Sequence, residues 1–150
     1  AKMSETGAII GGESSGGMAV RGHISGKDGI YAAALLVEML AVTGKSVSEL
    51  FAEITAQYGN PCWAEADFRM TPERKAELQN VLFEEKKVPE FGTAIDHVSL
   101  EDGCKVYFQD GSWVICRFSG TEPLLRMAAE ADEQAAADGY IKAFRDMLEL

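Results

Sequence analysis

The sequence predicts an α+β protein whose C-terminal part is a small antiparallel sheet with helices on one face. Short apolar segments alternate with polar residues and are separated by Asp-Gly pairs at 102–103 and 110–111, a pattern typical of hairpins. Helical periodicity flanks these strands. The first sixty residues instead predict one short strand and two helices, an incomplete α/β piece. We therefore divide the chain into residues 1–60 and 61–150.

The N-terminal part begins with an expected strand over 8–10 that enters a glycine-rich loop at 11–17. Asp28 is expected to cap a helix over 29–43, which Gly44 ends. This helix is apolar on nearly every side, and a helix without a polar face should be buried all round. Because this part encodes no sheet to cover it, we expect the chain to be the C-terminal part of a larger protein.

A capping box opens the second helix. Ser46 is followed three residues later by Glu49, and apolar residues then recur at helical spacing as far as Tyr58. The run Gly-Asn-Pro at 59–61 stops the helix. We place the domain boundary at this point.

The C-terminal part begins with a strand over 62–70, where apolar and polar residues alternate. Thr71-Pro72 then predicts the start of a helix that runs to about Glu84, because proline favours the first helical position. The remaining expected elements are a loop over 86–93, strands over 95–100, 104–109, 112–118 and 124–131, and a last helix capped by Asp132.

Composition argues against several classes of partner. The net charge of −10 lacks the basic footprint that a nucleic acid requires. The longest apolar run, 30–42, is interrupted by Glu38 and is shorter than the roughly 20 residues that span a bilayer. Three cysteines, Cys62, Cys104 and Cys116, form an odd count without metal-ligand spacing. We expect them to be buried, reduced thiols of a cytoplasmic protein.

The first loop carries groups suited to sugar hydroxyls. Glu13 follows two glycines and precedes Ser14 and Ser15, so a carboxylate and hydroxyls lie on a backbone that can approach a ligand closely. His23 and Lys27 follow the loop and are of types that can exchange a proton with a hydroxyl. The residues alone equally allow a surface turn with an incidental glutamate and a solvated basic pair.

The second loop, 117–123, carries groups suited to phosphate. Arg117 offers bidentate bonds to phosphate oxygens at the end of a strand. Ser119, Gly120 and Thr121 follow in a turn whose successive backbone N–H groups can form an anion-binding nest. A polar turn with a structural arginine remains the alternative.

Arg126 lies shortly after this loop, and its role stays open. It is close enough in sequence to join a phosphate site. It could instead pair with Glu122 or Glu130. The sequence does not decide between these roles.

The two motifs, in this order and about a hundred residues apart, resemble the α-D-phosphohexomutase superfamily of phosphoglucomutases and phosphomannomutases. The first loop is similar to the sugar-specificity loop of the family's third domain. The second is similar to the phosphate loop of the fourth domain. The resemblance covers essentially the whole chain and implies a TBP-like C-terminal domain preceded by the C-terminal piece of the third domain.

The resemblance also implies roles for single residues. Glu13 and Ser15 match positions that contact sugar hydroxyls, whereas Ser14 stands where many relatives carry a second glutamate. His23 and Lys27 match residues that line the active site, and the lysine is a candidate proton carrier. The positions implied to bind phosphate are Arg117, Ser119, Gly120 and Thr121.

The family's phosphoserine loop and its aspartate-rich magnesium loop are absent from this sequence. The resemblance therefore implies that Mg²⁺ and a hexose 1,6-bisphosphate intermediate act in a full-length enzyme that moves phosphate between the 1- and 6-positions of a hexose. This chain would bind the phosphorylated hexose beside the missing N-terminal domains, hold no metal, and be inactive alone. The alternatives are a free-standing, non-catalytic phosphosugar-binding or regulatory module and an interaction domain without a ligand.

Overall fold

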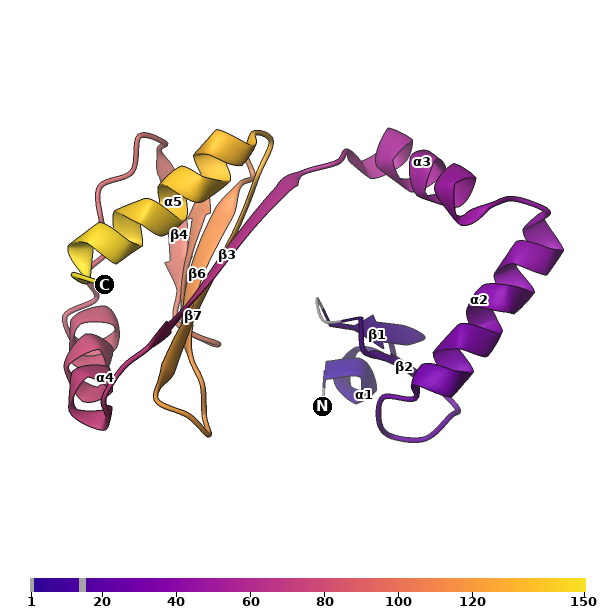
Figure 1. Cartoon of the computed structure of the whole chain (residues 1–150), viewed down its shortest axis with the longest axis horizontal. Coiled ribbons are helices and arrows are strands. Elements are labelled where there is room, and N and C mark those ends of the chain that lie inside the picture. Colours follow the sequence, from indigo (N-terminus) through magenta and orange to yellow (C-terminus); the bar gives the residue numbers. More distant parts are fainter. Residues whose placement is uncertain (1, 14–15) are drawn as a thin grey trace. The chain divides into compact units, whose positions relative to one another are not determined.

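The computed structural model describes residues 2–13 and 16–150. The chain divides into two compact units, an N-terminal unit Ala1–Tyr58 and a C-terminal unit Gly59–Leu150 (Figure 1). We describe each unit by itself.

The N-terminal unit begins with a short helix and a hairpin. The helix is α1 (Lys2–Thr6), and the antiparallel strands are β1 (Ile10–Gly12) and β2 (Met18–Val20). The expected strand over 8–10 is thus placed two residues too early, and α1 and β2 were not predicted. Strands of three residues flanked by glycine carry too little alternation to be recognised in a sequence.

Helix α2 (Gly29–Thr43) has the expected caps at both ends. One side-chain oxygen of Asp28 accepts hydrogen bonds at 3.0 Å from the backbone N–H groups of Ile30 and Tyr31. At the other end Gly44 adopts φ +66°, and its N–H donates to a carbonyl of the last turn at 2.9 Å. The predicted start and end of this helix are confirmed.

Helix α3 (Val47–Tyr58) is opened by the expected capping box. The Ser46 N–H donates to the Glu49 carboxylate at 2.8 Å, and the Glu49 N–H donates back to the Ser46 hydroxyl at 3.3 Å. The Ser46 hydroxyl also donates to the Glu49 carboxylate at 2.7 Å, and the two bonds that this carboxylate accepts, first the one from the Ser46 N–H, favour its ionised form and lower its pKa.

Helix α2 is not buried within this unit, although its composition predicts burial. None of its residues is fully buried, and Ile30 and Val42 are 86% and 79% exposed. The described residues of this unit form only the two-stranded β1–β2 sheet, which leaves the helix uncovered. Among the described helices none is by itself long and apolar enough to cross a membrane, although α2 and α3, bent by 86°, meet that criterion as a pair.

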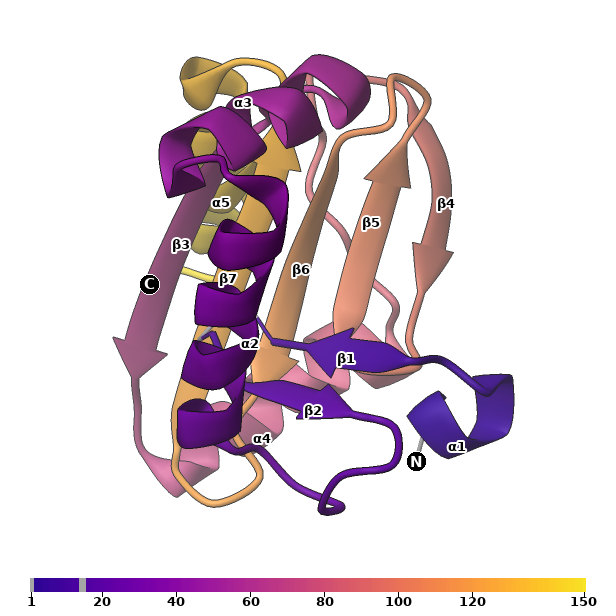
Figure 2. The ribbon, with the colours of Figure 1, turned by 90° about the vertical axis from the view of Figure 1, so that its right-hand side faces the viewer.

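The C-terminal unit is built on a five-stranded antiparallel sheet with the order β3-β7-β6-β5-β4 (Figure 2). Helices α4 and α5 lie on one face of it (Figure 1). The strands are β3 (Cys62–Arg69), β4 (Ile95–Ser99), β5 (Cys104–Phe108), β6 (Trp113–Phe118) and β7 (Leu124–Ala131). This arrangement confirms the predicted α+β class.

The core of this unit lies between the sheet and the helices. Alternate residues of β5 and β7 point into it, and Leu78 and Phe144 pack against them from the helices. The ring of Phe91, from the loop before β4, meets the rings of Phe108 and Phe144 edge-on at 4.9 and 5.6 Å. A loop without regular secondary structure therefore contributes an aromatic side chain that packs against the core.

Helix α4 (Pro72–Gln79) starts as expected, since the Thr71 hydroxyl accepts from the Arg74 N–H at 3.3 Å. It continues into a π-helical turn, Asn80–Glu84, which the sequence did not predict. The turn is closed by a bond from the Glu85 N–H to the Asn80 carbonyl at 2.9 Å.

The last helix, α5 (Gln134–Met147), begins one residue later than expected. Its N-cap is Glu133, whose side chain makes no capping bond, so the prediction that Asp132 caps it is wrong. The Glu133 carbonyl receives the first helical N–H bonds instead. The Asp132 backbone is turned toward β3, where its carbonyl accepts from the Cys62 thiol at 3.6 Å.

Two of the three cysteines are buried as expected. Cys104 and Cys116 lie opposite each other on β5 and β6 and are fully buried, whereas Cys62 is half-buried at the edge strand. Burial raises the pKa of the Cys104 thiol to about 11 and also raises that of Cys116. Both core thiols are therefore neutral at ordinary pH.

Candidate functional site

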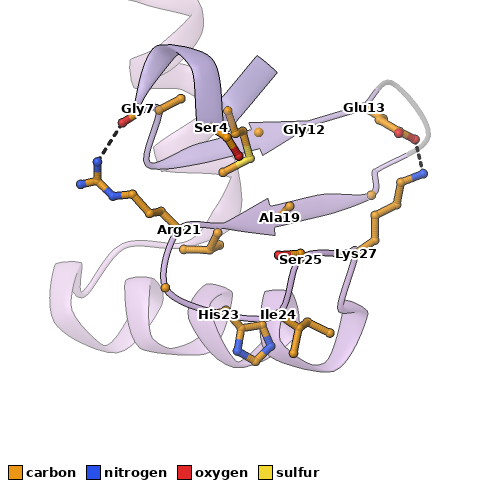
Figure 3. A pocket seen from close by; sticks show the side chains of 17 residues that line it. Ser4, Gly7, Gly12, Glu13, Ala19, Arg21, His23, Ile24, Ser25 and Lys27 are labelled. Carbon is orange, nitrogen blue, oxygen red and sulfur yellow. Dashed lines mark hydrogen bonds and ion pairs between the residues drawn. The ribbon is translucent and has the colours of Figure 1, made fainter. Parts of the chain in front are cut away.

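A hollow of about 620 Å³ lies in the N-terminal unit, between α1, the β1–β2 hairpin and the segment that follows it (Figure 3). Glu13 lies at the start of the hairpin loop, and Lys27 reaches it from beyond β2. His23 and Ser25 line the same hollow. Three predicted site residues, Glu13, His23 and Lys27, therefore line one hollow. Ser14 and Ser15 lie outside the described residues.

The Glu13 carboxylate and the Lys27 ammonium form an ion pair across the hairpin (Figure 3). The Lys27 chain passes so close to Gly17 that a Cβ on that residue would lie 2.5 Å from the Lys27 Cδ. Glycine at this position therefore lets the lysine lie against the hairpin. A hydroxyl that binds Glu13 must share the carboxylate with Lys27, so a sugar hydroxyl bound there would also lie beside the ammonium.

His23 has different partners. Its Nε2 lies 2.8 Å from the Asp28 carboxylate, and its ring stacks on Tyr31 with a centroid distance of 4.0 Å. The bond from His23 is the largest contribution that lowers the pKa of Asp28, followed by the bond from the Tyr31 N–H. His23 thus ties this segment to the start of α2.

A second side-chain interaction lies at the open end of the hairpin, away from the loop that carries Glu13. Arg21, directly after β2, donates from Nη1 to the carbonyl of Gly7 at 2.8 Å (Figure 3). Its backbone N–H also bonds to the Ile9 carbonyl at 2.8 Å. The side-chain bond ties the hairpin to the residue that follows α1, and the backbone bond extends the pairing of the two strands by one residue.

The second candidate site is a hollow of about 250 Å³ at the β6–β7 connection of the C-terminal unit. It is lined by Arg117, Phe118, Ser119, Gly120, Thr121 and Arg126. The four residues that the sequence analysis singled out here therefore line one hollow. Arg126, whose role the sequence left open, lines it with them.

The loop over residues 119–123, which we call the phosphate loop after the role that its resemblance implies, is shaped by bonds within itself. The Ser119 N–H donates to the Leu124 carbonyl at 2.8 Å, closing the turn. The Ser119 hydroxyl accepts from the N–H groups of Thr121 and Glu122 at 3.4 and 3.2 Å. Ser119 therefore folds the turn by its backbone and its side chain together.

Arg117 and Arg126 are direct partners in the β6–β7 register, so the two guanidinium groups project from the same face of the sheet. Arg117 lies 3.4 Å from Asp102 and Arg126 lies 3.9 Å from Asp67, and both arginine side chains are 61% exposed. Of the two roles that the sequence left open for Arg126, the structure gives a place in the hollow, and its ion-pair partner is Asp67 rather than Glu122 or Glu130. Like charges directly opposite each other are unfavourable, and an anion between them relieves the repulsion.

Arg126 could have been found from the sequence by counting across the hairpin. If the predicted strands over 112–118 and 124–131 pair antiparallel around the turn, position 126 falls opposite 117. Asp67 comes from the neighbouring β3, which pairs with β7 through a partner far away in the sequence. No local signal identifies that contact.

The acidic and imidazole side chains in the described ranges 2–13 and 16–150 do not gather into any group of three that could hold a metal ion. The magnesium that the resemblance implies therefore meets no fitting donor set in these residues.

Comparisons with known proteins match both units. Residues 1–58 match the model of the phosphoglucomutase/phosphomannomutase α/β/α domain III, and residues 68–147 match the model of the C-terminal domain of the same family. A phosphoglucomutase/phosphomannomutase from Thermococcus kodakarensis is 36% identical over 149 residues, which are 98% of this chain and 30% of the relative. A phosphoglucosamine mutase from Bacillus mycoides is 31% identical over 140 residues, 93% of this chain and 27% of the relative.

A solved structure gives the same result. A phosphoglucomutase/phosphomannomutase family protein from Burkholderia thailandensis aligns with a TM-score of 0.67 and 26% identity, over 99% of this chain and 29% of that protein. The chain thus spans less than a third of the length of these relatives. These matches confirm the resemblance noted in the sequence: the chain belongs to the phosphoglucomutase/phosphomannomutase family, with residues 1–58 matching its domain III and residues 68–147 its C-terminal domain.

Proposed function

We propose that this chain supplies the sugar-binding and phosphate-binding loops of a phosphohexose mutase. The observation that carries the proposal is the hollow at the β6–β7 connection, where Arg117, Arg126 and the phosphate loop come together. Two guanidinium groups beside a turn in which the Gly120 N–H has no partner among the described residues are suited to a phosphate monoester.

The N-terminal hollow supports the sugar-binding part of the proposal. A carboxylate such as Glu13 accepts hydrogen bonds from sugar hydroxyls, and Lys27 beside it can donate to the same hydroxyls or to a phosphate oxygen. As a proton carrier, Lys27 would exchange a proton at its Nζ with the hydroxyl that gains or loses phosphate. His23, bonded to Asp28, would orient this segment rather than touch the reacting hydroxyl.

In the full-length enzyme, these loops would hold the substrate while other domains carry out the transfer. Arg117 and the phosphate loop would bind the phosphate that is not being transferred, and Glu13 and Ser15 would hold the sugar. Mg²⁺ and a phosphoserine, from outside this chain, would supply the phosphoryl-transfer chemistry. A hexose 1,6-bisphosphate could be held in either orientation, because its two ends carry the same group. Relatives named for glucose, mannose and glucosamine phosphates leave the preferred hexose open.

The phosphate site is tested by titrating the chain with glucose 1-phosphate and following amide resonances by NMR. We expect the resonances of Ser119 to Glu122 to shift and the Kd to rise about tenfold or more in Arg117→Ala, because a charge-assisted bond contributes about 1.5–3 kcal/mol. Arg145→Ala, which removes an equal charge from α5, is the matched control and should leave the Kd unchanged. Loop resonances that stay fixed at high millimolar ligand would contradict the proposal.

The chain alone should show no mutase activity, because the phosphoserine and magnesium loops are missing from its sequence. A phosphohexose mutase assay with a hexose 1,6-bisphosphate activator and Mg²⁺ measures this. Turnover well above the blank, which persists after repurification, would refute it.

A further inference from the structure

The side chain of Lys75, on helix α4, forms hydrogen bonds with backbone carbonyls of the phosphate loop. Its Nζ donates to the backbone carbonyl of Ser119 at 2.7 Å and lies 3.3 Å from that of Glu122. Lys75 is half-buried and comes from a helix more than forty residues earlier in the sequence. Neither the sequence pattern nor the hollow itself singles out this residue.

The first bond sets the direction of a backbone donor. In a planar trans peptide, the carbonyl of one residue and the N–H of the next point in opposite directions. Because Lys75 holds the Ser119 carbonyl, the Gly120 N–H points away from the lysine. Among the described residues this N–H has no protein partner, and Gly120 lines the hollow.

The charge of Lys75 faces backbone carbonyls rather than a carboxylate. Lysines 27, 45, 87 and 142 each lie beside a carboxylate. Within the described part of the chain, Lys75 has the two loop carbonyls as partners and no carboxylate at ion-pair distance. Its positive charge therefore adds to those of Arg117 and Arg126 around the same loop.

We propose that Lys75 is a positioning residue of the phosphate site, which orients the Gly120 N–H toward the anion and adds a positive charge behind the loop. The inference rests on the proposed function of the loop. Lys75 acts through the two carbonyls and does not touch the phosphate. It would make the loop ready to bind before the ligand arrives, so that less order has to be gained on binding.

The test uses the 150-residue chain, with inorganic phosphate and glucose 1-phosphate as probes and the Gly120 amide as the readout. We expect Lys75→Met to raise the Kd for both probes about three- to tenfold and to speed hydrogen exchange at Gly120. Lys75→Arg keeps donors and charge and should restore binding to within about twofold. Lys75→Gln keeps a donor without the charge, and we expect an intermediate Kd that depends less on salt. Lys142→Met removes an equal charge from α5 and is the matched control.

The outcomes separate this inference from the proposed function. If Arg117→Ala leaves phosphate binding unchanged, the loop is not a phosphate site and both proposals fail. If Arg117→Ala weakens binding while Lys75→Met matches Lys142→Met, the role of Lys75 is overturned and the site stands. Should Lys75→Met fail to fold, the glutamine and arginine variants decide: a weakened glutamine variant with an intact spectrum supports the inference, and wild-type binding in both overturns it.

Discussion

The two units of this chain contrast in how their apolar residues are placed. Every residue of the buried core cluster belongs to the C-terminal unit, where a five-stranded sheet and its helices enclose them. Among the described residues of the N-terminal unit none is fully buried, although α2 is the more apolar helix. The composition of a helix therefore predicts whether its surface needs to be buried. The strands and helices around it determine whether the same chain can bury it.

The contrast extends to the two candidate sites. The phosphate loop connects neighbouring strands of the five-stranded sheet, and Lys75 of helix α4 donates to two of its carbonyls. The Glu13 hairpin belongs to a sheet of only two strands, and side chains tie it through the Arg21 bond to Gly7 and the ion pair of Glu13 with Lys27. We therefore expect phosphate binding to be retained in this chain more fully than sugar binding.

The largest expected effect separates a core residue from an exposed one. Phe144→Ala removes a fully buried ring and should lower the free energy of unfolding of the C-terminal unit by about 3–5 kcal/mol. Ile30→Ala, on the exposed α2, should change it by less than about 0.5 kcal/mol. Urea unfolding followed by tryptophan fluorescence measures this directly, because both tryptophans lie in the C-terminal unit. Equal effects of the two variants would break the contrast.

A smaller difference is expected between two glycines with positive φ. A Cβ on Gly103, at φ +112°, would lie 2.6 Å from the Cys116 carbonyl oxygen, so Gly103→Ala should cost about 1–3 kcal/mol. Gly44, at φ +66°, has open space around it, and alanine there should cost about 1 kcal/mol of helix-end stability. Urea unfolding measures the first, and amide exchange in α2 measures the second. A cost for Gly44→Ala above that for Gly103→Ala would contradict the expected order.

The smallest expected effect concerns pH and the caps of α2 and α3. The pKa of Asp28 is lowered in the folded chain, so its contribution is present above the ordinary carboxyl pKa and is lost as the pH falls through the folded value. Glu49 behaves in the same way. Amide exchange at the start of α2 should therefore become faster below about pH 4, relative to the exchange expected from pH alone.

Asp28→Asn provides the control for this prediction, because asparagine also caps a helix but does not titrate. In that variant the start of α2 should lose little protection on acidification. Helix α5, which begins without a side-chain capping bond, should likewise change little at its start. Equal acid sensitivity in the variant would show that the loss arises outside the cap.

Much of the fold could be predicted from local patterns. The Asp-Gly turn at 110–111 is confirmed, since Gly111 has φ +90° and the Asp110 carboxylate accepts from the Ser112 N–H at 2.9 Å. The caps of α2 and α3 and the start of α4 were also predicted, because each depends on residues within one turn of the helix. The segments that alternate at a period of two all form strands.

The features that were missed depend on contacts distant in sequence or on very short elements. The π-helical turn after α4 carries no propensity signal, and the ion pair of Arg126 with Asp67 requires the pairing of β3 with β7. At the candidate sites, residue types and glycines indicated which side chains to consider. The hydrogen bond between His23 and Asp28 and those from Lys75 to the phosphate loop could be identified only from the folded structure.

The facing thiols of Cys104 and Cys116 can report how often the sheet opens locally. A thiol that is both enclosed and protonated is inert toward alkylating reagents until the strands around it separate. The edge-strand Cys62 supplies a reference that is modified without such an opening. The rate at which Cys104 and Cys116 are alkylated, divided by the rate for Cys62, would therefore report how often the strands around the buried thiols separate. No label has to be introduced into the chain for this measurement.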